Sequence, residues 1–254
     1  TPTIAALARC VLDDVDRAAE ALKEARHPRI HVFLSSSDIH ILHLLRKNRE
    51  EIMDMAVTAV TQAKKYYEDV EFSPMDATRT EPEYLYTLLE ATIKAGATTV
   101  NIPDTVGWAV PDQFGELIAH LHANVKEFQT GKAIISVHCH NDLGLAVANS
   151  LAAVKAGARQ IECTVNGIGE RAGNAAMEEI VMALKTRKDV YRGFTCGVNT
   201  KEIVKASKLV ARMSGLNVQR SKAIVGENAF ATSAGIHQDG ILKKRETYEI
   251  MDPK

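Results

Sequence analysis

Short apolar stretches alternate with helix-like segments along most of this sequence, and this alternation limits the possible fold more than any other feature. Six stretches are typical of strands, at residues 3–8, 29–35, 69–75, 98–103, 133–140 and 160–166. Between them, apolar residues recur at the three- and four-residue spacing of amphipathic helices. Because strand–helix–strand crossovers return the chain in one direction, the sequence predicts a parallel sheet.

Two local patterns support this reading. Residues 93–100 read IKAGATTV and residues 154–161 read VKAGARQI, so the same helix end, glycine and strand start occur twice, two strand–helix units apart. Asn48, with Glu51 three residues later, forms a capping-box pattern that predicts the start of a helix.

Polar residues at the strand ends decide between two parallel architectures. An open doubly wound sheet can be complete with six strands, whereas a (β/α)8 barrel needs eight. In a barrel the strand ends converge on one mouth. We therefore expect a (β/α)8 TIM barrel that lacks its first two β/α units, with residues 1–215 as the barrel domain and 216–254 as the start of a linker region. The polar residues concerned are His31, Ser73, Thr105, His138, His140 and Asn174.

The composition narrows the functional classes. With 46% hydrophobic residues, 25% charged residues and a net charge of −1, nothing favours nucleic-acid or membrane-surface binding. No apolar run approaches the roughly 20 residues of a membrane span. The four cysteines lie far apart without CxxC spacing, so the sequence implies neither a disulfide framework nor a cysteine zinc site, and a reducing, cytoplasmic location fits best.

The strand at residues 133–140 ends in His138-Cys139-His140, the strongest candidate for chemistry. Successive strand residues point to opposite faces, so the two histidines share a face. Two imidazoles with oxygen ligands suit Mn²⁺, Zn²⁺, Co²⁺ or Mg²⁺. The alternative is a buried, hydrogen-bonded histidine pair. We expect Asp142, just beyond, to cap the following helix.

Two further stretches leave alternatives open. Asn166–Asn174, NGIGERAGN, is either a tight turn or a turn that presents Asn174 to a metal, and it matches neither GxGxxG nor the P-loop. His237 lies in GIHQDG, which we read as a loop; it is either a solvated histidine or a general acid/base. Tyr248 by itself indicates nothing.

Taken together, several segments resemble the isopropylmalate branch of the DRE-type TIM-barrel metallolyase superfamily. They are HCHND with NGIGERAGN, NIPDTVG, RIHVF with SSDIH, VEFSP, and GIHQDGILK with YEIMDP. The resemblance implies that acetyl-CoA condenses with 2-oxoisovalerate, and that hydrolysis of the thioester then releases CoA and gives 2-isopropylmalate in leucine biosynthesis. Related branches use other 2-oxoacids and form citramalate, homocitrate or methylthioalkylmalate.

The resemblance also implies roles for individual residues. His138, His140 and Asn174 would bind a divalent metal, Mn²⁺, Zn²⁺, Mg²⁺ or Co²⁺, and Thr105 would bind the substrate carboxylate. His31 and Ser73 would line the pocket. His237 would be the acid/base group and Tyr248 its helper, reaching across a homodimer as they often do in the family.

Three departures from the family favour a catalytic-domain fragment or an altered copy. The family's opening D-x-x-R-D motif, which supplies a metal-binding aspartate and an arginine, does not occur in this sequence. Met75 stands where the family has a glutamate, and strand alternation points Asp76 elsewhere. A C-terminal regulatory domain is also not part of these 254 residues. A non-catalytic homologue that binds only metal or a partner is therefore the second reading.

Overall fold

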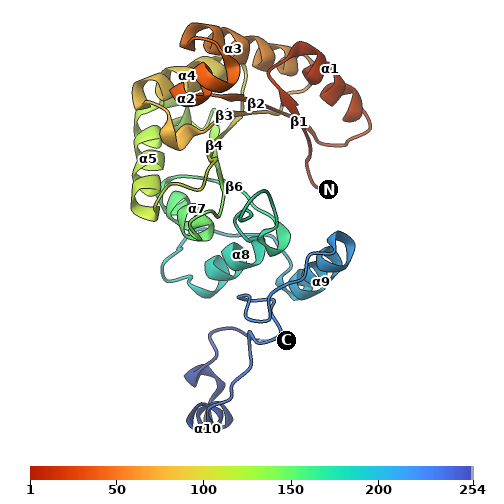
Figure 1. Ribbon diagram of the computed structural model, residues 1–254, viewed down its shortest axis with the longest axis vertical. Coiled ribbons are helices and arrows are strands. Elements are labelled where there is room, and N and C mark those ends of the chain that lie inside the picture. The colour runs from red at the N-terminus through yellow and green to blue at the C-terminus, as the bar shows by residue number, and fades with distance from the viewer. Residues whose placement is uncertain (253–254) are drawn as a thin grey trace. The chain divides into compact units, whose positions relative to one another are not determined.

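The strands and helices of the computed structural model, which describes residues 1–252, follow the predicted alternation (Figure 1). The chain divides into two units, Thr1–Glu162 and the residues from Cys163 onward, which are described separately. The elements of the first unit are β1 (Ile4–Arg9), α1 (Leu12–Ala21), β2 (Pro28–Ser35), α2 (Asp38–His40), η1 (Ile41–Leu45), α3 (Arg49–Tyr66), β3 (Val70–Met75), η2 (Ala77–Arg79), α4 (Pro82–Ala95), β4 (Thr99–Asp104), α5 (Pro111–Asn124), α6 (Lys126–Gln129), β5 (Ile134–Cys139), α7 (Ala146–Ala156) and β6 (Gln160–Glu162).

The six strands form one parallel sheet in chain order, β1-β2-β3-β4-β5-β6. The prediction of an eight-stranded barrel that lacks its first two units is therefore wrong. The first strand already begins at Ile4, and the sheet is an open half-barrel with β1 and β6 at its edges. The sequence pattern identified the strands correctly, but ring closure depends on hydrogen bonds between strands, which the pattern of one strand does not record.

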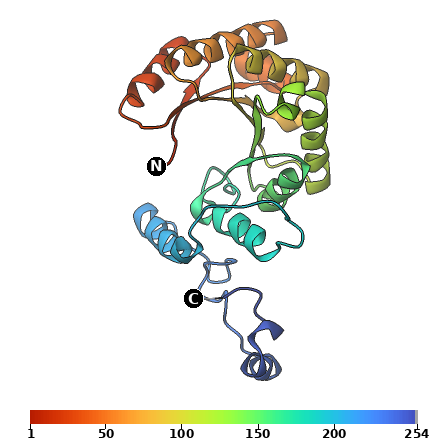
Figure 2. The same ribbon diagram turned by 180° about the vertical axis from the view of Figure 1, so that it is seen from behind.

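The two faces of this sheet differ in chemistry. Helices α1, α3, α4 and α5 lie on one side of the curved sheet, as Figures 1 and 2 show. Strand residues on that side are apolar and fully buried, and alternate positions on the other side are mostly polar. The apolar side includes Ile30, Val32, Phe72, Val100, Ile102 and Val137, and the polar side includes His31, Glu71, Ser73, Asn101, Ser136 and His138.

The repeated helix end of the sequence is a repeated structure. Gly96 after α4 and Gly157 after α7 both have a φ of +129°, which side chains rarely adopt. A Cβ at Gly96 would come within 2.8 Å of the Lys64 side chain, and one at Gly157 within 2.9 Å of the His122 ring. Each glycine thus lets a helix end pack closely on the preceding long helix before the next strand begins.

The second unit begins with the glycine-rich turn, and short helices alternate there with longer irregular stretches. Its elements are η3 (Val165–Gly167), α8 (Met177–Thr186), η4 (Thr200–Glu202), α9 (Ile203–Ser214), α10 (Gly235–Lys243) and η5 (Arg245–Thr247). Within residues 1–252, no helix combines the length and the apolar character needed to cross a membrane.

Candidate metal centre

Two histidines at the end of β5 bring their ring nitrogens together. His138 lies in β5 and His140 directly follows it, while Cys139 between them is fully buried. Nε2 of His138 lies 3.1 Å from Nε2 of His140, and the ring centroids are 4.9 Å apart. The two imidazoles therefore share one face of the sheet, as strand alternation predicted.

Glu162, in β6, contacts the other ring nitrogen of His138. The parallel register pairs the two residues, and Oε2 of Glu162 lies 2.7 Å from Nδ1 of His138. Asn101 Nδ2 donates to the same oxygen at 3.3 Å. Burial raises the pKa of Glu162, but the hydrogen bonds with His138 and Asn101, and the attraction of the nearby histidines in their protonated forms, outweigh it and lower the pKa overall. The carboxylate is therefore held in its charged, hydrogen-bond-accepting form.

His31 and Ser73, predicted to line a substrate pocket, lie on the same polar face. Nε2 of His31 is 2.6 Å from Oγ of Ser73, and Asn101 Nδ2 donates to that hydroxyl at 2.9 Å. Burial lowers the pKa of His31, which favours the neutral ring. The structure thus brings His31 and Ser73 together with Asn101 in one buried network.

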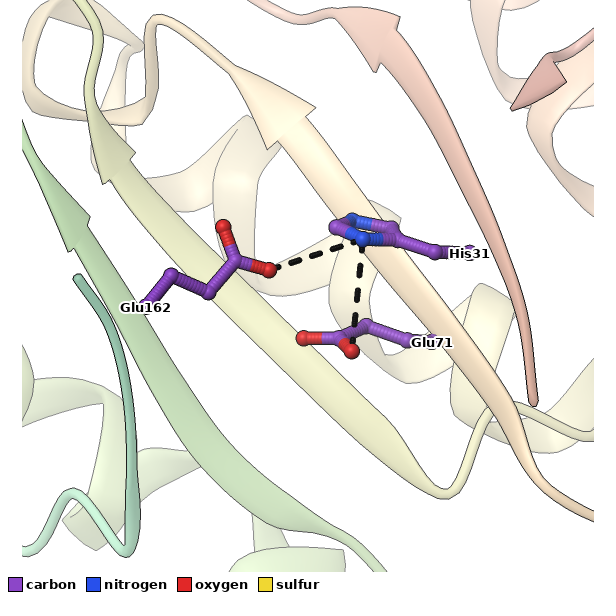
Figure 3. Close-up of side chains that lie close together, drawn as sticks. All are labelled: His31, Glu71 and Glu162. Atoms are coloured by element: carbon purple, nitrogen blue, oxygen red, sulfur yellow. Dashed lines mark ion pairs between the residues drawn. The ribbon is translucent and has the colours of Figure 1, made fainter. Parts of the chain in front are cut away.

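The same network contains a group that could hold a metal ion by distance alone. His31, Glu71 and Glu162 each offer one ligand atom, and these atoms lie within 4.8 Å of one another. In Figure 3 both carboxylates point toward the His31 ring, with Glu162 Oε1 3.5 Å and Glu71 Oε2 4.0 Å from Nδ1.

Glu71, however, already has donors on both oxygens. Arg29 Nη1 donates to Oε2 at 3.0 Å, and Gln160 Nε2 donates to Oε1 at 2.7 Å. Burial and the charge of Glu162 raise the pKa of Glu71 to about 7, although Arg29 opposes them. The guanidinium therefore supplies beside Glu71 the positive charge that a metal ion would bring.

Thr105, predicted to bind a substrate carboxylate, lies in the turn after β4. Its Oγ1 accepts a hydrogen bond from the backbone N of Asp76 at 2.8 Å. Asp76 follows Met75, the last residue of β3, and has a φ of 68°. Its fully buried carboxylate accepts hydrogen bonds from Arg79 at 2.8 Å and Ser37 at 2.5 Å. Asp76 is thus directed to these partners, and because it follows β3 in a left-handed conformation, strand alternation does not set its orientation.

The glycine-rich stretch 166–174 folds back on itself. Asn174 N donates to the carbonyl of Gly167 at 3.0 Å. Gly173 has a φ of +94°, and a Cβ there would stand 2.1 Å from that carbonyl oxygen, so no side chain fits. Asn174 Nδ2 donates to the carbonyl of Ile168 at 3.4 Å, whereas Oδ1 is buried without a hydrogen-bond partner among the described residues. The stretch is a tight turn that leaves this oxygen unengaged.

His237 lies on helix α10, so the prediction of a loop around it is wrong. Its ring stacks against Tyr248, with centroids 4.2 Å apart and an interplanar angle of 34°. Gly240 makes room for this pair, because a Cβ there would come within 2.7 Å of the Tyr248 ring. The two glycines that we took for loop residues thus lie within a helix, and one of them serves packing.

Asp142 does not cap the following helix, contrary to the prediction. Helix α7 begins only at Ala146, and Asn141 Oδ1 accepts a hydrogen bond from its backbone N at 3.2 Å. Asp142 packs instead against Gly107, where a Cβ would come within 2.5 Å of Asp142 Oδ2. The neighbouring asparagine takes the contact because the chain makes a further turn before the helix starts.

Comparisons with known proteins place the chain in a family. A family model described as HMGL-like matches residues 1–210. The chain belongs to the HMGL-like family. A second model, described as homocitrate synthase post-HMGL domain-like, matches residues 224–254. The polar strand face therefore lies within the HMGL-like domain.

Three curated relatives are 2-isopropylmalate synthases. The chain is 63% identical over 254 residues to the 2-isopropylmalate synthase of Methylacidiphilum infernorum, covering 100% of this chain and 50% of that protein. Against the 2-isopropylmalate synthase of Syntrophus aciditrophicus it is 61% identical over 251 residues, covering 99% of this chain and 48% of that protein. The synthase of Pyrococcus furiosus is 59% identical over 253 residues, with coverage of 100% and 50%. The chain thus spans about half the length of the curated relatives it matches.

Solved structures with the HMGL-like fold are more distant in sequence. The hydroxymethylglutaryl-CoA lyase of Pseudomonas aeruginosa superposes with a TM-score of 0.69 at 19% identity, covering 85% of this chain and 71% of that one. The lyase of Bacillus subtilis gives 0.69 at 23% identity, with coverage of 84% and 71%. These matches establish the fold alone.

Three members of the HMGL-like domain's polar face were not predicted from the sequence: Glu71, Asn101 and Glu162. Glu71 lies in VEFSP and Asn101 in NIPDTVG, two of the segments that carry the family resemblance, but neither was given a role in metal binding or catalysis. Each lies two residues from another polar residue of its strand, which is the spacing that marks a single face. Parallel strands are usually apolar on both faces, so polar residues at these positions were the available signal.

Proposed function

We propose that the chain carries the metal site and part of the substrate pocket of an acetyl-CoA-dependent synthase that converts 2-oxoisovalerate to 2-isopropylmalate. The observation that carries this proposal is the pairing of His138 and His140, whose Nε2 atoms lie 3.1 Å apart. Identities of about 60% to three 2-isopropylmalate synthases support the choice of reaction.

The residues present fit a divalent ion. Two ligands that bind one metal at roughly 2.1 Å, at roughly tetrahedral or octahedral angles, lie about 3.0–3.4 Å apart, and the two Nε2 atoms meet this condition. Asn174 Oδ1, a buried acceptor that has no hydrogen-bond partner within residues 1–252, has the chemistry of a third ligand. Imidazole and amide oxygen together suit Mn²⁺, Zn²⁺, Co²⁺ or Mg²⁺. We assign His138, His140 and Asn174 to this ion.

The alternative group of His31, Glu71 and Glu162 suits an ion less well. Arg29 and Gln160 donate to both oxygens of Glu71, so an ion there would have to displace these donors and bind beside a guanidinium. We therefore assign the metal to the histidine pair and His31 to the pocket wall.

When bound, the metal supplies Lewis-acid polarisation of the 2-oxoacid carbonyl. Thr105 would bind the substrate carboxylate, and His31 and Ser73 would orient the substrate. The condensation needs a base that takes a proton from the acetyl methyl group and an acid that returns one to the new hydroxyl. We assign this acid/base role to His237, with the stacked Tyr248 as its helper, in a homodimer.

Two alternative functions are retained. Met75 ends the third strand where a glutamate would face the pocket, which favours a homologue that binds metal without turnover. A related synthase that forms citramalate, homocitrate or methylthioalkylmalate from another 2-oxoacid is the other alternative. A cytoplasmic location also stays a prediction.

The deciding experiment combines turnover with metal content. Release of free CoA is measured with acetyl-CoA and a panel of 2-oxoacids, and we expect the fastest release with 2-oxoisovalerate. If no 2-oxoacid causes release of free CoA although the metal still binds, the result would instead support the non-catalytic homologue.

Metal content is measured in parallel, in wild type, in His138→Ala/His140→Ala and in Glu71→Gln. Loss of the ion in the histidine variant alone supports the assignment. If only Glu71→Gln loses the ion, the metal site is instead the group of His31, Glu71 and Glu162.

A further inference from the structure

We propose that Glu162 is a positioning residue that fixes the tautomer of His138 and so prepares that ring to bind a cation. This inference rests on the proposed function, because it assumes that the ion binds the histidine pair. Glu162 itself would not contact the ion: its role is to act through the ring that does.

The hydrogen-bond geometry defines the tautomer. An ionised carboxylate can only accept a hydrogen bond, so the 2.7 Å contact between Glu162 Oε2 and His138 Nδ1 places the proton on Nδ1. A neutral imidazole then carries its lone pair on Nε2. Nε2 is the nitrogen that lies 3.1 Å from His140 Nε2, so the lone pair is directed to the place where we locate the ion.

The fold fixes the carboxylate as firmly as the ring. Glu162 and His138 are paired in the register of β5 and β6, on the same face of the sheet. Asn101 Nδ2, from β4, donates to the same carboxylate oxygen at 3.3 Å and to Ser73 Oγ at 2.9 Å. Three neighbouring strands therefore determine where the acceptor for His138 lies.

Glu162 also connects the histidine pair to the proposed substrate pocket. Its second oxygen, Oε1, lies 3.5 Å from Nδ1 of His31, and the opposite nitrogen of His31 is 2.6 Å from Ser73 Oγ. One carboxylate thus faces a proposed metal ligand and a proposed substrate-binding ring. Outer carboxylates that hold metal-binding histidines in this way typically contribute a factor of about 10–100 to metal affinity.

Two variants test the proposal. Glu162→Leu removes the acceptor with little change in length, and Glu162→Gln keeps an acceptor oxygen but removes the charge. The first readout uses the metal-free chain: ¹⁵N chemical shifts of His138, identified by their loss in His138→Ala, report which ring nitrogen carries the proton. We expect the Nδ1–H form in wild type and a shift toward the Nε2–H form in Glu162→Leu.

The second readout is the affinity for Mn²⁺, measured by calorimetry on the same proteins. We expect Glu162→Leu to weaken binding toward the 100-fold end of the range and Glu162→Gln toward the 10-fold end. Glu71→Gln is the matched control, since it makes the same change on the same face without contacting His138, and its affinity should stay within about twofold of wild type. If Glu162→Leu does not fold, Glu162→Gln carries both readouts.

The outcomes separate the two proposals. An unchanged tautomer and an unchanged Mn²⁺ affinity in the Glu162 variants would overturn the positioning role. Equal Mn²⁺ binding by wild type and His138→Ala/His140→Ala would overturn the metal assignment instead, whatever the tautomer shows. Weakened binding in Glu71→Gln as well as in the Glu162 variants would indicate that Glu162 is itself a ligand, and would also contradict the positioning role.

Discussion

The two faces of the half-barrel sheet are built from alternate residues of the same strands, yet they differ in the interactions that hold their side chains. Toward the helices, Phe72 and its neighbours are fully buried and apolar. On the opposite face, Glu71 and Ser73 are almost as deeply buried but are held by hydrogen bonds to other polar side chains. Burial therefore does not distinguish the faces. What differs is the free energy each face contributes, and its dependence on pH and on metal.

The largest effect expected is at the apolar face. Phe72→Ala removes a side chain that is fully buried in β3, and such changes lower the free energy of unfolding by about 3–5 kcal/mol. Its matched control is Ser73→Ala, the next residue along the strand. That change leaves His31 and Asn101 without one partner and should cost about 1–3 kcal/mol. Urea unfolding of both variants measures the difference, and equal losses would contradict the division of roles between the faces.

The polar face should make stability depend on pH through Glu71. Its pKa is about 7 in the folded protein, against 4.5 as its ordinary value, so the folded chain binds more protons than the unfolded chain between these values. Stability is then lost as pH rises through this window, by an amount on the order of 3 kcal/mol. Glu162, whose pKa is lowered, adds no change above its ordinary value.

His31 acts in the opposite sense, which sets the design of the test. Its lowered pKa means that the folded chain binds fewer protons, so its contribution to stability falls as pH drops below 6.5. Unfolding by urea should therefore be compared between wild type and Glu71→Gln from pH 5 to pH 8. We expect the difference between the two curves to grow in favour of the variant as pH rises. Parallel curves would show that Glu71 does not titrate in this window.

Metal should stabilise the chain only through the histidine pair. A ligand at 100 times its Kd raises the free energy of unfolding by about 2.7 kcal/mol. We expect Mn²⁺ at that excess to raise the melting temperature of wild type and of Phe72→Ala, and to have no effect on His138→Ala/His140→Ala. Addition of a chelator should reverse the rise. Stabilisation of the histidine variant would place the ion elsewhere.

The spacing of residues in the sequence predicted much of the structure of the two faces. The six strands, the shared face of His138 and His140 and the repeated glycine ends follow from local spacing, and the structure confirms them. What the sequence could not supply is the pairing between strands. Glu162 matters because the register sets it beside His138, and no pattern within β6 records that.

The wrong predictions have the same physical origin. A barrel was expected because polar strand ends were taken to converge in a closed ring, but closure is a property of the edges and not of the strands. Gly235 and Gly240 were taken as loop signals around His237, whereas they lie in α10 and Gly240 accommodates the Tyr248 ring. In both cases a local signal was given a meaning that only a distant contact could decide.

The smallest effect expected is a baseline that involves neither face. Asn48 Oδ1 accepts from Glu51 N at 2.9 Å, and the Glu51 side chain accepts from Asn48 N at 2.9 Å, which closes the predicted capping box at the start of α3. Asn48→Ala removes one side of this exchange and should lower the free energy of unfolding by about 1 kcal/mol. Because the box lies apart from the polar network, the loss should be the same at pH 5.5 and pH 8, and Mn²⁺ affinity should not change. A loss that varied with pH in step with Glu71 would show that the helix layer and the polar face are energetically coupled, and the two faces could then no longer be treated as independent.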